Sequence, residues 1–107
     1  MVYELRVYRC MPGRKGDLVA RFRNHTMGFF KRHGIDVVGF WDTLVGDTDE
    51  LIYMTRYNSW EEREKKWGAF QADEEWQRVR EQTQARGPIV EHIRTALLTE
   101  TDFSPKV

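Results

Sequence analysis

The sequence predicts an α+β fold in which two helical blocks cover a four-stranded antiparallel sheet. Segments of strand and helix character follow in the order strand, helix, strand, strand, helix, strand, which is the split βαβ, or ferredoxin-like, arrangement (βαββαβ). The 107 residues correspond to one domain. The chain holds 4 Trp, 4 Tyr and 6 Phe residues, more large aromatic side chains than one small core needs. We therefore expect the open face of the sheet to be covered too, by a second copy of the chain or by a ligand.

The first predicted strand spans residues 2–10 and alternates between two faces. Glu4, Arg6 and Tyr8 share one face, and bulky apolar side chains occupy the other. Pro12 and the glycine after it turn the chain. Because both faces carry bulky side chains, we expect this strand to lie in the middle of the sheet.

Residues 15–33 predict a helix, since apolar side chains recur along them with helical spacing. One stripe has spacings of four, three and four: Leu18, Phe22, His25 and Phe29. We expect this stripe, with His25 in its middle, to face the sheet. Arg21 and Arg23 fall mostly on the solvent side, and Gly34 ends the helix.

A β-hairpin is predicted next, from residues 35–45 and 51–57, because both segments are rich in β-branched and aromatic side chains. Turn-forming residues at 46–49 connect them. Gly39 indicates a bulge or a close backbone approach within the first of these strands. The last strand of the sheet is predicted at residues 89–99.

The second helical block begins with a capping box, in which Ser59 caps the helix and Glu62 reaches back to the chain before it. Asp73 has the character of a second N-cap. We therefore expect the block to break near Asp73 and to resume as far as about Ala85.

The composition argues against several kinds of partner and compartment. The 17 basic and 17 acidic residues cancel, so no electrostatic field favours nucleic acid or an anionic membrane. Cys10 is the only cysteine, which fits a reducing compartment. With no signal peptide and no apolar run that could cross a bilayer, we expect a cytoplasmic protein. The predicted domain covers residues 1–100, and a polar tail follows at 101–107.

Several of these motifs resemble those of NIPSNAP-type domains, in the same order along the chain. The matching motifs are Tyr3-Glu4-Leu5-Arg6-Val7-Tyr8 with Pro12-Gly13, Gly39-Phe40-Trp41, Ser59-x-x-x-Arg63-x-x-x-Trp67-x-x-Phe70, Asp73-x-x-Trp76 and Asp102-Phe103-Ser104-Pro105. The resemblance covers nearly the whole chain. It implies a dimeric α/β barrel, in which two ferredoxin-like protomers pack sheet against sheet. Proteins of this wider fold include small cofactor-independent oxygenases, haem-degrading oxygenases, lactone isomerases and chlorite-cleaving haem enzymes, whereas many NIPSNAP-type proteins have no assigned reaction.

The face of the first strand that carries Arg6 is the candidate substrate site. We expect Arg56, His92 and Arg94 beside it if the strand register allows. Arginine grips planar anions with two bonds, so we predict that Arg6 and Arg56 hold a carboxylate, enolate or phenol-like substrate. The alternative is a structural network, in which Glu4 pairs with one of these arginines across a dimer interface.

His25 and Tyr8 are the candidate groups for proton transfer. His25 has two alternatives, as a haem ligand or as a core histidine that a backbone carbonyl or tyrosine hydroxyl satisfies. All four tryptophans point inward by their spacing; Trp41 and Trp67 are the candidate pocket walls, with aromatic core packing as the alternative. No metal site is expected, since the three histidines lack zinc-type spacing.

Three functions remain open at this point. The first is a homodimer that binds a small aromatic or anionic molecule and oxygenates or isomerises it without a nucleotide cofactor. The second is a non-catalytic protein-interaction or scaffold module, whose tail clasps the partner through Phe103. The third is a haem-handling enzyme with His25 as the ligand.

Overall fold

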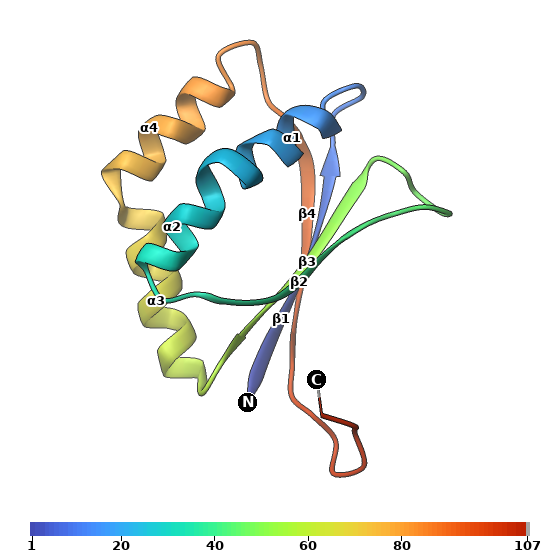
Figure 1. The fold of residues 1–107 in the computed structure, drawn as a ribbon, viewed down its shortest axis with the longest axis vertical. Helices are drawn as coiled ribbons and strands as arrows, with labels where there is room; N and C mark the ends of the chain where they lie inside the picture. Colours follow the sequence, from blue (N-terminus) through green and yellow to red (C-terminus); the bar gives the residue numbers. More distant parts are fainter. Residues whose placement is uncertain (107) are drawn as a thin grey trace.

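The computed structural model describes residues 1–106 and consists of one four-stranded sheet with all helices on one face (Figure 1). The strands are β1 (Val2–Cys10), β2 (Asp36–Asp42), β3 (Glu50–Tyr57) and β4 (Val90–Leu98). They lie in the order β2-β3-β1-β4, and every neighbouring pair is antiparallel. The predicted ferredoxin-like fold and the central place of β1 are therefore confirmed.

The first helical block is one run of three segments, and the second is two helices at an angle. The segments are α1 (Lys15–Arg21), the π-helical η1 (Phe22–Thr26), α2 (Met27–Arg32), α3 (Trp60–Ala72) and α4 (Glu74–Thr83). Ser59 Oγ accepts a hydrogen bond from the backbone N–H of Glu62 at 3.1 Å, and Asp73 accepts from the N–H groups of Glu75 and Trp76. Both predicted caps and the predicted break at Asp73 are thus present.

The π-helical segment changes which side chains of the first block face the sheet. A π turn holds an extra residue, so the helix beyond it is rotated relative to a continuous α-helix. The buried stripe runs at spacings of four: Leu18, Phe22, Thr26 and Phe30. His25 is exposed, so the expectation that it faces the sheet was wrong.

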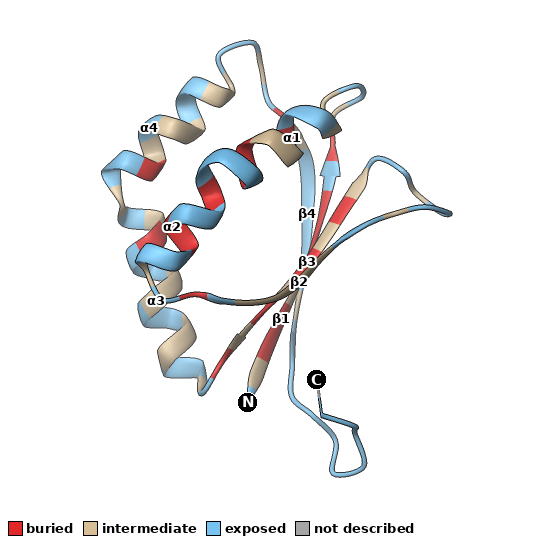
Figure 2. Cartoon of the chain, viewed as in Figure 1, coloured by how far each residue is buried: buried red, intermediate tan, exposed pale blue. Residues whose placement is uncertain are grey.

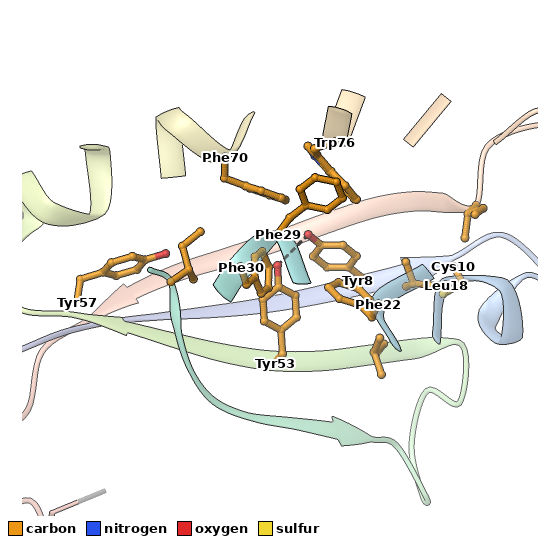
Figure 3. Close-up of a cluster of buried hydrophobic side chains, with 13 residues drawn as sticks. Tyr8, Cys10, Leu18, Phe22, Phe29, Phe30, Tyr53, Tyr57, Phe70 and Trp76 are labelled. Carbon is orange, nitrogen blue, oxygen red and sulfur yellow. Dashed lines mark hydrogen bonds between the residues drawn. The ribbon is translucent and has the colours of Figure 1, made fainter. Parts of the chain in front are cut away.

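The core lies between the sheet and the helices and is built largely of aromatic rings (Figure 3). At its centre the ring of Tyr53 is stacked on Phe40, with ring centres 4.8 Å apart, and meets Phe22 edge to face at 5.2 Å. Such pairs add to the stabilisation that burial provides. Figure 2 shows buried residues on β1, β3 and the inward sides of the helices.

Strand β4 is the least buried strand of the sheet. Figure 2 shows it exposed along almost its whole length. Ile93 pairs with the buried Tyr8 and so lies on the helix-facing side, yet it is exposed. After Leu98 the chain leaves the sheet as an irregular tail, in which Phe103 is 83% exposed. The last residue of the predicted tail, Val107, lies outside the described residues.

Within residues 1–106, no helix combines the length and the apolar composition needed to cross a membrane.

Candidate functional site

A cavity of about 180 Å³ lies between the sheet and the two helical blocks. Its apolar wall includes four aromatic rings and two residues of β4: Phe22, Phe30, Phe70, Trp76, Val90 and Ile93. Its polar lining includes Arg6 and Tyr8 from β1, Arg21 from α1 and Arg80 from α4. Among the described residues that line it, none is an aspartate or glutamate. Three cationic side chains and an aromatic wall make this cavity suited to an anionic or electron-rich ring.

The cationic group of Arg6 is held by a buried hydrogen-bond network. Its Nη1 donates to Glu4 Oε2 at 3.0 Å, and its Nε and Nη2 donate to the Tyr8 hydroxyl at 3.3 and 3.2 Å. The Tyr8 and Tyr53 hydroxyls lie 3.0 Å apart (Figure 3). Glu4 also accepts two hydrogen bonds from Arg63 of α3, at 3.1 and 2.9 Å. Two cations therefore share one carboxylate.

The two tyrosines of this network differ in their surroundings. Burial raises the pKa of Tyr53 well above its ordinary value, so Tyr53 remains a neutral phenol. Tyr8 lines the cavity, and its oxygen accepts from Arg6. The Tyr8 hydrogen can therefore point either to Tyr53 or into the cavity. A phenol backed by a cation is a suitable donor to a ligand oxygen on which negative charge develops.

Of the two tryptophans predicted as pocket walls, Trp67 contacts this network and Trp41 does not. The Trp67 ring lies beneath Arg6, with the guanidinium carbon 4.4 Å from the ring centre, and Arg63 lies 5.7 Å away. Trp67 is half-buried and packs against the core without lining the cavity. It therefore orients Arg6 through a cation–π contact, whereas it was expected as a pocket wall.

Arg56 and Trp41 are not part of this site. The register pairs Arg56 with Tyr3 and Trp41 with Ile52, which places both side chains on the open face of the sheet. Arg56 donates from Nε to Asp36 Oδ2 at 2.6 Å, and Trp41 is 48% exposed. The expectation that Arg56 lies beside Arg6 was wrong. Arg56 pairs with Tyr3, and Tyr3 and Arg6 point to opposite faces of β1, because successive side chains of a strand alternate between the two faces.

The same register corrects two further expectations. His92 pairs with Arg9 and Arg94 pairs with Val7, so both lie on the open face and not beside Arg6. Trp60 is exposed at the start of α3, so the prediction that all four tryptophans point inward was also wrong.

His25 lies in an outer groove of about 360 Å³, between the first helical block and the end of α4, and Arg21 lines both this groove and the cavity. The groove is lined by charged and polar groups, including Arg14, Asp17, Asn24 and Arg86, and its apolar lining consists of two alanines. Haem needs an extended apolar pocket, so these surroundings do not fit a haem ligand. Among residues 1–106, no group of three or more His, Cys, Asp or Glu side chains is placed to hold a metal ion.

A protein-family comparison decides the relationship that the motifs suggested. The family model described as NIPSNAP matches residues 3–105. The chain belongs to the NIPSNAP family. No curated protein matches the sequence.

Solved NIPSNAP structures share the fold over almost the full chain. An uncharacterised NIPSNAP domain protein from Burkholderia xenovorans superposes with a TM-score of 0.85 and 20% identity, over 99% of this chain and 100% of that one. A NIPSNAP family protein from Agrobacterium tumefaciens gives 0.86 and 24%, over 97% and 96%. A Streptomyces coelicolor monooxygenase, solved with the ligand nanaomycin D, gives 0.64 and 10%, over 99% and 92%. At these identities the likeness concerns the fold alone.

Two cationic cavity residues of this NIPSNAP domain, Arg21 and Arg80, were missed by sequence reasoning. Arg21 was expected mostly on the solvent side, but α4 covers it, and Arg80 lies on α4 itself. A weak signal existed for Arg21. It follows the buried Leu18 by three residues, and residues at that spacing share one face of a helix.

Proposed function

We propose that this NIPSNAP protein is a homodimer that binds a small aromatic or anionic molecule in the cavity between sheet and helices. The observation that carries the proposal is the pair of Arg6 and Tyr8, which presents a cation-backed phenol to a cavity with aromatic walls. The fold shared with a monooxygenase that was solved with the ligand nanaomycin D is a further support.

The size of the cavity limits the ligand to about one ring. Its volume is about 180 Å³. An apolar cavity of roughly 150 Å³ holds benzene, so a single substituted ring fits here without rearrangement. A larger ligand would have to extend past Ile93, toward the side where β4 is exposed.

The chemistry that fits this geometry is the stabilisation of an enolate or phenolate oxygen. The Tyr8 hydroxyl can donate to such an oxygen while Arg6 balances the charge that develops there. In an isomerisation, one carbon of the substrate loses its proton to water and another carbon takes a proton from water, because no carboxylate or histidine is among the described residues that line the cavity. A cofactor-independent oxygenation would start from the same anion, with molecular oxygen as co-reactant. His25 has no part in this proposal, because it lies in the outer groove.

Ligand titration tests the binding site. Single-ring phenols and aromatic acids are titrated into the purified protein and followed by ligand-observed NMR, for the wild type, Tyr8→Phe and Tyr57→Phe. We expect saturable binding that Tyr8→Phe weakens and that Tyr57→Phe leaves unchanged, since Tyr57 is a buried tyrosine that does not line the cavity. A folded wild-type protein that binds no member of the panel would refute the proposed function.

The homodimer is proposed to form through the open face of the sheet. Apolar side chains from all four strands share this face: Leu5, Trp41, Ile52, Met54 and Leu98. The helices lie on the other side, so a second copy is the simplest cover for a face of this kind.

The oligomeric state is measured by light scattering coupled to size exclusion. We expect a wild-type dimer that Met54→Asp converts to a monomer, because the change places a charge in the proposed interface. Met27→Asp is the matched control, since Met27 is exposed on α2. A monomeric wild-type protein at micromolar concentration would contradict the dimer but leave the cavity proposal intact.

The second candidate is a non-catalytic interaction module, which the exposed apolar side chains outside the sheet favour. Leu44, Val45 and Phe103 are almost fully exposed. If the tail clasps a partner protomer through Phe103, deletion of residues 101–107 weakens the dimer. Unchanged assembly would remove this support.

A further inference from the structure

Arg21 is a buried cation without a counter-ion. Its residue is 7% exposed, and its Nε is buried with no hydrogen-bond partner. Its Nη1 makes one long contact with Thr83 Oγ1, at 3.4 Å. Within residues 1–106 no carboxylate lies within ion-pair distance of it. Burial lowers the pKa of Arg21, which reflects the cost of keeping this charge away from water.

A second unpaired donor belongs to the same cavity. The indole Nε1 of Trp76 is buried and has no hydrogen-bond partner, and both Trp76 and Arg21 line the cavity. The guanidinium carbon of Arg21 lies 5.7 Å from the centre of the Trp76 ring. The donors come from α1 and α4, which are separate helices. Two helices therefore each bring a side chain with an unpaired donor to the wall of one cavity.

The surroundings of Arg6 differ from those of Arg21, because the donors of Arg6 have partners. Arg6 is similarly buried, but Glu4 and Tyr8 satisfy its donors. A buried charge or N–H group without a partner costs free energy that a ligand can restore on binding. Arg80 lines the same cavity and adds positive charge. An anion with strong acceptor oxygens would suit these donors and charges.

We propose that Arg21 and the indole N–H of Trp76 form the anion subsite of this cavity, and that the ligand is a single-ring aromatic carboxylate. Its carboxylate accepts from both donors, and its ring packs on the aromatic wall. This inference rests on the proposed ligand-binding function and narrows it to one substrate class. It also makes Arg21 the residue that selects anionic over neutral ligands.

The test compares benzoate with its neutral analogue benzamide by calorimetric titration. Wild type should bind benzoate more tightly than benzamide. Arg21→Met should lose benzoate affinity by roughly tenfold or more, because hydrogen bonds to charged groups are among the strongest, while benzamide binding stays similar. Arg23→Met is the matched control. Arg23 is the second residue of η1, is exposed and does not line the cavity. Without ligand, Arg21→Met should melt at the same temperature as wild type or higher, since an unpaired charge is removed.

A second variant covers the case in which Arg21→Met does not fold. Arg21→Lys keeps the charge but loses the planar fork that binds both carboxylate oxygens, so it should still weaken benzoate binding. Equal benzoate affinity in wild type and in the folded Arg21 variants overturns the subsite. A wild type that binds neutral phenols but not benzoate also overturns it and leaves the proposed function standing. Binding of neither class refutes the proposed function itself.

Discussion

The guanidinium carbon of Arg6 lies 4.4 Å from the centre of the Trp67 ring, so a residue of β1 rests on a residue of α3. Arg63, four residues before Trp67, reaches the same region and donates to Glu4. Glu4 and Arg6 on one strand are thus tied to Arg63 and Trp67 on one helix. This arrangement fixes the position of Arg6, and Arg6 in turn holds the hydroxyl of Tyr8 at the cavity.

Removal of the Glu4 charge should strongly destabilise the fold. Glu4 is 1% exposed and is the shared acceptor of Arg6 and Arg63. Glu4→Gln leaves Arg6 without a counter-ion and Arg63 with only the exposed Glu64, and breaking a buried pair from one side costs about 3 kcal/mol or more. Urea unfolding measures the change. Glu64→Gln is the control, because exposed Glu64 also pairs with Arg63 and should cost at most about 1 kcal/mol. Equal effects of the two variants would argue against a buried network.

Tyr8→Phe and Tyr57→Phe should differ in their effect on stability. The Tyr8 hydroxyl contacts Arg6 and Tyr53, so its loss leaves buried groups unsatisfied and should cost about 1–3 kcal/mol. The Tyr57 hydroxyl is buried without a partner, so its loss should be neutral or slightly stabilising. Paired thermal and urea unfolding measure both changes. A larger loss for Tyr57→Phe would contradict the hydrogen bonds of the Tyr8 hydroxyl to Arg6 and Tyr53.

Gly39 and Trp41 are expected to be energetically coupled. A Cβ atom added at Gly39 would lie 2.9 Å from Cζ2 of Trp41, so Gly39→Ala should displace that ring. Because the ring is partly exposed and can move, we expect a cost of about 1 kcal/mol. In a Trp41→Ala background the same change should cost nothing. Urea unfolding of the four proteins gives the coupling energy, and an equal cost in both backgrounds would contradict the close approach.

Asp73 should make stability depend on pH in the acid range. Hydrogen bonds, first from His33 and then from Arg32, lower the pKa of Asp73 from 3.8 to about 2. The folded-state pKa is below the unfolded value, so the stabilisation is present above about pH 4 and is lost as the pH falls through 2.

The matching experiment compares wild type with Asp73→Asn from pH 7 to pH 2. Asparagine also caps helices, so the substitution removes mainly the charge. The variant should melt below wild type at pH 7, and the difference should shrink between pH 4 and 2. Asp17→Asn, which removes an exposed ion pair with Arg14, should show a smaller difference throughout. A difference in melting temperature between wild type and Asp73→Asn that does not change with pH would contradict a stabilising role for the Asp73 charge.

The parts of the fold that sequence reasoning predicted correctly depend on local signals. The caps at Ser59 and Asp73 follow from side chains that bond to nearby backbone groups. The bulge at Gly39 is present too, between Val37 and Gly39, where the register with β3 shifts. Alternation along residues 2–10 correctly placed Arg6 and Tyr8 on one face. Each of these signals spans only a few residues.

The errors concern relations between distant segments or a change of helical phase. Arg56 and Trp41 were assigned to the site although the register between β1, β2 and β3 places them on the opposite face. His25 was assigned to the stripe because an α-helical period was assumed through η1. Arg21 was assigned mostly to solvent because its spacing from Leu18 is a weak signal and the helix that covers it, α4, is distant in the sequence.

The sequence by itself determined the order of the elements, the breaks between them and the family, because those depend on side-chain periodicity, caps and turns within short stretches. The tertiary structure alone decided which polar side chains meet. The reason is physical: strand register sets the face on which each cation lies, and helix packing decides which of them lose water. Strand register and the packing of α3 together bring Glu4 and Arg63 into contact. Arg21 is left in the cavity with an unpaired donor by the packing of α4.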